Sequence, residues 1–251
     1  MVQNATRSPW PVGFPDVLVH TSVARRDAHP CYARAKAGDP NAALTLSLDL
    51  LEEAVTNALR EKLAGRSAIL LPVIAEETSG FNAIPDAMAQ VLGRDLSLPV
   101  VAGEIVQTNK VGHTRARAFQ RLVTPAMFEG EVELGAAYVL IDDHIGLGGT
   151  LANMRGHVEA HGGTVVLITT LTESREAKRI SLTPQTREVL WRQHGEELDT
   201  LWKVQFGYGI DCLTEVEALQ LCRQQSVAAI EDFLAQAAVE ARGRNIEAAF
   251  E

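Results

Sequence analysis

The chain has 251 residues, of which 46% are hydrophobic and 22% are charged, so it can bury a sizeable core. No run approaches the roughly eighteen apolar residues of a membrane span, and the N-terminus lacks the apolar segment of a signal peptide, which predicts a cytoplasmic protein without a membrane partner. The formal net charge of -9 argues against a nonspecific nucleic-acid surface, and the three scattered cysteines indicate neither a disulfide framework nor a zinc site.

The first segment, residues 1–65, is predicted to be an arm followed by a helix. Prolines punctuate residues 1–38, which we expect to pack irregularly on the main domain. Asp39 and Pro40 then give a helix start, an N-cap followed by proline at the first helical position. Apolar residues recur every three or four positions over Leu44–Leu63, so we expect one amphipathic helix packed on a sheet.

Two apolar runs, residues 68–75 and 98–106, predict strands of that sheet. A loop follows the first run and leads into a helix that Gly93 is expected to end. In this order of strand, glycine-containing loop and helix, backbone amides can hold an anion, although an ordinary turn and helix cap would have the same pattern. The loop residues of interest are Thr78, Ser79, Gly80 and Asn82.

A long polar connection, residues 107–135, comes next. Connections of this length inside a compact domain are usually functional loops or ribbons. Its basic residues cluster within twelve positions, and a local cationic cluster in an acidic protein indicates an anionic ligand. A solvated charged loop is the alternative. The cluster comprises Lys110, His113, Arg115, Arg117 and Arg121.

Residues 138–150 begin as a strand and continue into a pair of carboxylates. Tyr138–Ile141 form a short run with branched residues and no polar alternation, which predicts a strand buried on both faces. Asp142 and Asp143 then fall at its carboxyl end. In open parallel sheets that end is where ligands bind.

A glycine-rich turn completes the same stretch. Gly146, Gly148 and Gly149 permit backbone conformations in which successive N–H groups face one anion. Thr150 adds a hydroxyl at a helix start, where unpaired amides and the helix dipole already favour a phosphate. The pattern predicts a cradle in which carboxylates hold sugar hydroxyls or a metal and amides hold a phosphate.

Beyond this stretch the chain gives one more strand, residues 164–171, and then becomes helical. Strands and helices thus alternate over residues 68–171, which is typical of a parallel sheet wound with helices. Helix starts follow at Thr183 with Pro184, at Thr214 with Glu217 as a capping box, and at Ser226. Aromatic residues in this helical part are expected in a core rather than against a ligand. They are Trp191, Trp202, Phe206 and Tyr208.

Val139–Asp143 followed by Gly148–Leu151 resembles the phosphoribosyl pyrophosphate (PRPP) motif of the type I phosphoribosyltransferases. The loop at residues 79–82 and the basic stretch at residues 110–121 stand where that family keeps its pyrophosphate loop and its mobile catalytic loop. The order and spacing agree over residues 66–172. The resemblance implies an α/β fold in which a twisted parallel sheet is flanked by helices. The core would be residues 66–172, between an N-terminal arm and helix at 1–65 and a helical C-terminal extension at 173–251.

The resemblance also implies an activity, the Mg-dependent transfer of 5-phosphoribosyl from PRPP to a nitrogenous base or related acceptor, with release of pyrophosphate. The adjacent acids would hold the ribose hydroxyls, the turn would hold the 5-phosphate, and Mg would arrive with PRPP and contact Asp142 or Asp143. Lys110, Arg115 and Arg117 would join the two aspartates as catalytic residues by closing over the pyrophosphate. A homodimer is one expectation for the assembly. The implied PRPP-binding set is Asp142, Asp143, Gly146, Leu147, Gly148, Gly149 and Thr150.

Three positions depart from the family pattern. Leu147 replaces the first threonine of the T-G-G-T turn, and Ser79 stands where many members carry a basic residue. Gly146 takes the place of an aspartate that 6-oxopurine enzymes use to contact the base, which disfavours hypoxanthine or guanine as the acceptor. Two alternatives stay open: a non-catalytic sensor of PRPP or nucleotides on the same fold, and a Rossmann-like nucleotide binder, although the glycine spacing does not match G-x-G-x-x-G.

Overall fold

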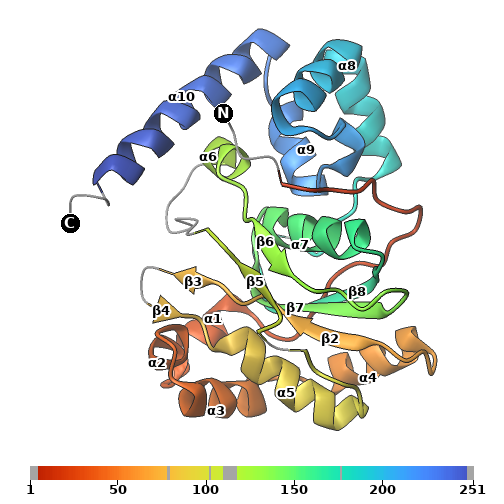
Figure 1. The fold of residues 1–251 in the computed structure, drawn as a ribbon, viewed down its shortest axis with the longest axis vertical. Helices are drawn as coiled ribbons and strands as arrows, with labels where there is room; N and C mark the ends of the chain where they lie inside the picture. The colour runs from red at the N-terminus through yellow and green to blue at the C-terminus, as the bar shows by residue number, and fades with distance from the viewer. Residues whose placement is uncertain (1–4, 78–79, 102, 110–117, 176, 248–251) are drawn as a thin grey trace.

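The structure is a computed structural model that describes residues 5–77, 80–101, 103–109, 118–175 and 177–247. A parallel sheet with the strand order β1–β8–β7–β2 forms its centre (Figure 1). Helices lie on both faces of this sheet, so the predicted α/β class is confirmed. The strands are β1 (Leu18–Val19), β2 (Ile69–Pro72), β7 (Ala137–Ile145) and β8 (Thr164–Glu173).

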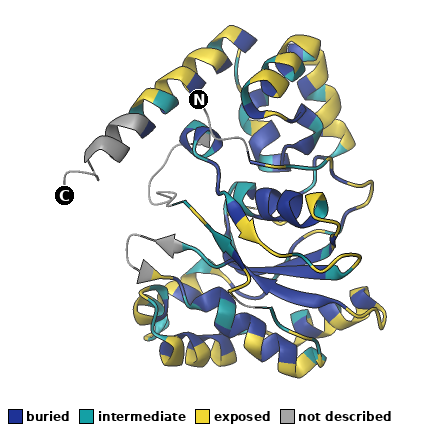
Figure 2. Cartoon of the chain, viewed as in Figure 1, coloured by how far each residue is buried: buried dark blue, intermediate teal, exposed yellow. Residues whose placement is uncertain are grey.

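Alternate residues of the central strand β7 enter two separate hydrophobic clusters. Val139 and Ile141 pack with the helices of the N-terminal half, whereas Tyr138 and Leu140 pack with the helices that follow the strand. This is the consequence of side chains alternating across a sheet that is covered on both faces. Figure 2 shows the buried strands between helices whose outer faces are exposed.

The first face is covered by α3 (Pro40–Leu50), α4 (Glu53–Leu63) and α5 (Ile84–Leu96). The expected single helix ending at Leu63 is therefore two helices. Leu51 and Glu52 are extended, with ψ of 116° and 129°, and the Glu52 N–H donates to Nδ1 of His20 at 3.2 Å. The helix is thus interrupted at a tertiary contact, although the apolar pattern of the sequence is continuous.

Gly93 does not end the following helix, as the sequence predicted, because α5 continues to Leu96. A Cβ at Gly93 would lie 2.6 Å from Cγ2 of Val100, so this glycine allows the helix to pack closely on the next segment. The expected strand at residues 98–106 is also divided. Val100 makes an isolated bridge to Leu70, and only the end of the run forms β5 (Ile105–Gln107).

A ribbon, one of the forms expected for the long connection, is present where β5 pairs antiparallel with β6 (Phe128–Gly130). The helix α6 (Ala118–Val123) lies between these strands in sequence. A smaller ribbon, β3 (Glu76–Glu77) with β4 (Gly80–Phe81), precedes α5.

The N-terminal arm is more regular than its prolines suggested, because it contains β1 and two short helices. These are α1 (Val23–Asp27) and α2 (Tyr32–Lys36). The second face of the sheet is covered by α7 (Gly149–Ala160), and the C-terminal helices lie beyond α7 on the same side (Figure 1). The latter are α8 (Pro184–Phe206), α9 (Glu215–Cys222) and α10 (Val227–Glu247), with a 3-10 turn η1 (Ile210–Cys212).

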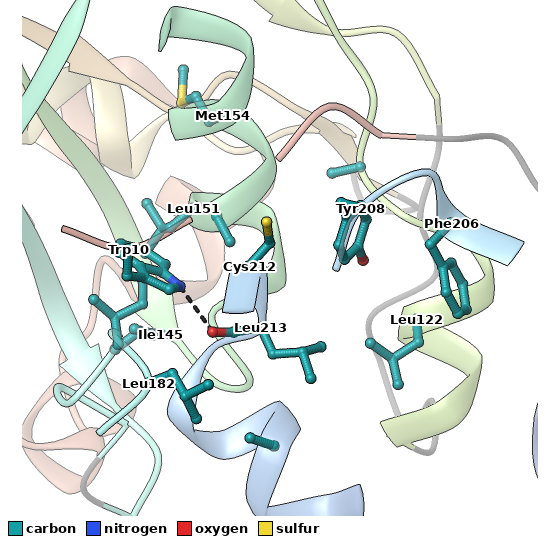
Figure 3. Close-up of a cluster of buried hydrophobic side chains, with 14 of the residues drawn as sticks. Trp10, Leu122, Ile145, Leu151, Met154, Leu182, Phe206, Tyr208, Cys212 and Leu213 are labelled. Atoms are coloured by element: carbon teal, nitrogen blue, oxygen red, sulfur yellow. Dashed lines mark hydrogen bonds between the residues drawn. The ribbon is translucent and has the colours of Figure 1, made fainter. Parts of the chain in front are cut away.

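Caps read from the sequence are present at Thr183 and Thr214, and Thr214 forms the predicted capping box with Glu217. One core unites the arm with the C-terminal helices (Figure 3): Trp10 donates from Nε1 to the carbonyl of Leu213 at 2.8 Å. The core prediction for the aromatic residues is confirmed for Trp202, Phe206 and Tyr208, and it is wrong for Trp191, which is 51% exposed. Within the described residues, none of the helices combines the length and apolar character needed to cross a membrane.

Candidate functional site

A cavity of about 250 Å³ opens where strands β2 and β7 end, at the carboxyl edge of the parallel sheet. It brings Asn82, Asp142 and Asp143 together with the loop at residues 146–150, so residues predicted from three separate patterns line one space. Gly80 lies in β4, two residues before Asn82. The other predicted site residues, Thr78, Ser79, Lys110, Arg115 and Arg117, lie outside the described residues.

The two aspartates are buried at the cavity wall, with 8% and 5% of their surfaces exposed. They belong to β7, which continues to Ile145, so they lie inside the strand and not beyond its end as the sequence suggested. Asp142 Oδ1 accepts the N–H of Asp143 at 2.8 Å, and Asp143 Oδ2 accepts Nζ of Lys36 at 2.8 Å. The carbonyl of Asp143 also accepts the Thr172 hydroxyl at 3.1 Å.

The pKa values of the two carboxyls move in opposite directions. Burial, and then the charge of Asp143, raise the pKa of Asp142 well above its usual range. Burial opposes ionisation of Asp143 as well, but the Lys36 ammonium, a hydrogen bond with Asp142 and the charge of His144 together lower that pKa. Asp142 therefore holds a proton more readily than Asp143, and the pair offers both a donor and acceptors to the hydroxyls of a ligand.

The loop that faces the aspartates has the geometry of an anion site. Gly148 caps α7 with φ of 82°, a conformation that favours glycine. Within the described part of the chain, the backbone N–H groups of Gly146, Leu147 and Gly148 donate to no backbone carbonyl. The first amides of α7 follow directly, and its dipole adds positive potential at the same place.

The start of the C-terminal helix α9 packs against this loop. Thr214 donates from Oγ1 to the carbonyl of Leu147 at 2.6 Å, and a Cβ on Gly148 would lie 3.2 Å from Cγ2 of Thr214. Glu217 lines the cavity, and its Oε1 would lie 2.9 Å from a Cβ on Gly149. The sequence indicated these two residues only as a helix cap, because nothing local shows that this helix packs on the glycine turn.

Arg7 of the N-terminal arm completes this support. It pairs with both Glu217 oxygens, at 2.6 and 2.9 Å, and donates from Nε to Oδ1 of Asn153 at 2.6 Å. Burial disfavours the charge of Arg7, but Glu217 more than offsets this, so the pKa of the guanidinium is raised. No local pattern indicates this pairing, which joins residues 210 positions apart.

Three further ionisable residues among those described line the cavity. Arg121, the member of the basic cluster that lies within the described residues, places Nη1 3.0 Å from where a Cβ on Gly146 would stand, and burial lowers its pKa. Burial also lowers the pKa of His144. Its Nδ1 lies 2.9 Å from the Thr172 hydroxyl, and its Nε2 lies 2.9 Å from the Ser174 hydroxyl. Lys36 is the third. Among the described residues, no group of three or more His, Cys, Asp or Glu could hold a metal ion.

Two curated relatives match the chain. It is 38% identical over 241 residues to Protein TraN of Escherichia coli, a match that covers 96% of this chain and 53% of that protein. It is 38% identical over 152 residues to an uncharacterized protein of Haemophilus influenzae, which covers 61% of this chain and 34% of that protein. The chain thus spans about half the length, or less, of the curated relatives it matches. No family model matches it.

Solved structures with some similarity include an adenine phosphoribosyltransferase, at 16% identity and a TM-score of 0.37, covering 55% of this chain and 72% of that one. The orotate phosphoribosyltransferase of Aeropyrum pernix aligns at 20% identity and a TM-score of 0.29, covering 51% of this chain and 64% of that one. These scores are too low to assign a function to the chain.

Proposed function

We propose that the chain is a phosphoribosyltransferase that binds PRPP and transfers its 5-phosphoribosyl group to a nitrogenous base or related acceptor, with release of pyrophosphate. The observation that carries the proposal is the single cavity shared by the aspartate pair and the loop at residues 146–150. Carboxyls suit the hydroxyls of a sugar, and backbone amides at a helix start suit a phosphate. A ribose 5-phosphate group needs both, at opposite ends of one small space.

Catalysis at such a site depends mainly on positioning the substrate. Positive charge grows on the ribose ring as pyrophosphate departs, so the site must hold both ends of PRPP and neutralise the leaving group. Asp142 and Asp143 would fix the ribose hydroxyls, while the amides of Gly148, Gly149 and Thr150 would fix the 5-phosphate. In this proposal Lys110, Arg115 and Arg117, together with the loop residues Thr78 and Ser79, contact the pyrophosphate.

The described residues fit a Mg ion that is shared with the substrate. Mg in proteins is usually bound by one or two carboxylates and by substrate phosphates, without a dedicated protein cage. Asp142 and Asp143 supply carboxyl groups at the cavity wall, and a Mg ion bound there would displace the proton that Asp142 holds. When bound, Mg would neutralise charge on the leaving pyrophosphate.

A pyrophosphate-release assay over a panel of free bases, with PRPP and Mg, tests the proposal. Calorimetric titration with PRPP runs in parallel, so that binding and turnover are scored separately. The proposal expects saturable PRPP binding and release of pyrophosphate with at least one base. Absence of PRPP binding would remove its basis.

A second candidate, a non-catalytic sensor of PRPP or nucleotides, is favoured by Leu147. This residue lines the cavity and is apolar at a position where the motif has a hydroxyl. Binding of PRPP without turnover of any base would favour the sensor. Calorimetric titration with NAD beside PRPP distinguishes a Rossmann-like binder. Such a protein would bind NAD and would not bind PRPP.

A further inference from the structure

The end of α2 packs against the segment that carries Asn82. The carbonyl of Ala35 accepts the N–H of Ala83 at 3.2 Å. A Cβ on Gly38 would lie 2.8 Å from the carbonyl oxygen of Phe81, so the two backbones are in close contact. The arm therefore presents its last helical residue, Lys36, to the part of the cavity that Asn82 lines.

From this position the Lys36 side chain reaches the aspartate pair on β7. Its Nζ lies 2.8 Å from Oδ2 of Asp143, and the side chains are 26% and 7% exposed. Lys36 lines the same cavity as Asn82 and Asp143. Lys36 thus connects the segment at residues 81–83, on which its helix packs, to the aspartate pair, which its ammonium contacts.

This placement has an electrostatic consequence for any anionic ligand. The ion pair of Lys36 and Asp143, 2.8 Å long, places a positive charge beside a negative one at the cavity wall. An ionised carboxylate alone would repel a diphosphate, but an adjacent ammonium cancels this repulsion. The positive charge of the ammonium attracts a phosphate oxygen within the same cavity while the ammonium stays paired with the carboxylate.

We propose that Lys36 is a binding residue for the diphosphate group of the substrate, bridging the ribose carboxylates to the leaving group. The inference rests on the proposed function and deepens it. It assigns the cation at this end of the cavity to the N-terminal arm. The arm is then part of the binding site as well as a support for the sheet.

Calorimetric titrations with Mg test this on Lys36→Met and Lys36→Gln, with PRPP, inorganic pyrophosphate and ribose 5-phosphate as probes. Both variants should bind PRPP and pyrophosphate about tenfold to a hundredfold more weakly, which is the effect of losing one charge-assisted hydrogen bond. Binding of ribose 5-phosphate should stay within about twofold, because that probe lacks the diphosphate. Gln keeps a donor for Asp143, so it covers the case in which Met disturbs the fold.

Arg34→Met is the matched control. Arg34 lies on the same helix, with a side chain that is 69% exposed and paired with Asp39, and its loss should leave all three affinities unchanged. Unchanged PRPP affinity in both Lys36 variants would overturn the inference, and so would an equal loss for ribose 5-phosphate, which would reduce Lys36 to a counter-ion of Asp143. If the unaltered protein bound neither PRPP nor ribose 5-phosphate, the proposed function itself would fail, and the inference with it.

Discussion

The hydroxyl of Thr214 donates a hydrogen bond of 2.6 Å to the backbone carbonyl of Leu147. The bond links the N-cap of a C-terminal helix to the middle of the glycine turn, 67 positions earlier in the chain. The same hydroxyl accepts the N–H of Glu217, and a carboxylate oxygen of Glu217 accepts the N–H of Thr214. A helix cap thus also orients the amides that are proposed to hold a phosphate.

Thr214→Val should lower both stability and affinity. Loss of an N-cap hydroxyl costs about 0.5–2 kcal/mol of unfolding free energy, which urea denaturation would measure. Release of the Leu147 carbonyl should weaken PRPP binding in calorimetry. Thr214→Ser is the control, because it keeps the hydroxyl and should stay close to the unaltered protein in both measurements. Equal behaviour of the Val and Ser variants would show that the hydroxyl has no such role.

Breaking the Arg7–Glu217 pair should be more costly. The two side chains are 3% and 2% exposed, so Arg7→Met leaves a buried carboxylate without its counter-ion. Such changes cost about 3–5 kcal/mol. Urea denaturation of Arg7→Met, Glu217→Gln and the double variant forms a cycle, and we expect the double variant to lose less than the sum of the single losses. Additive losses would mean that the two side chains do not stabilise one another.

His20 makes the stability of the protein dependent on pH. It is 2% exposed, and burial lowers its pKa from 6.5 to about 4. The unfolded chain therefore takes up a proton between these values while the folded chain does not. The contribution of neutral His20 to the free energy of unfolding is complete above about pH 6.5. It is lost as the pH falls toward about 4, by up to about 3 kcal/mol.

His20→Asn removes this titration and keeps an acceptor for the N–H of Glu52, which His20 accepts at 3.2 Å. Urea denaturation at several values between about pH 7 and pH 4 should show a smaller decline for the variant. An identical decline in both proteins would show that other groups cause it.

Local patterns predicted the parts of this molecule that depend on local chemistry. The alternation of strands and helices indicated the parallel sheet, and the caps at Thr183 and Thr214 were read correctly because a cap is a contact between near neighbours. The apolar repeat up to Leu63 gave one helix in place of two, because the break at Glu52 depends on His20, 32 positions away.

The site was predicted in part for the same reason. The aspartates and the glycine turn are contiguous, and they do line one cavity. Lys36 was not predicted to lie beside Asp143, since 107 positions separate them. Side chains brought together by the packing of the arm and the C-terminal helices have no spacing by which a sequence could identify them.

The most direct test of the account is a calorimetric titration of PRPP with Mg into the unaltered protein and into Asp142→Asn. We predict saturable binding to the unaltered protein, and affinity at least about a hundredfold lower in the variant, because two hydroxyl contacts depend on the carboxylate pair. Asp95→Asn, which changes a carboxylate that is paired with Arg94 at the protein surface, should bind as the unaltered protein does. Equal PRPP affinity in Asp142→Asn and the unaltered protein would contradict the proposal that this cavity binds the ribose of PRPP.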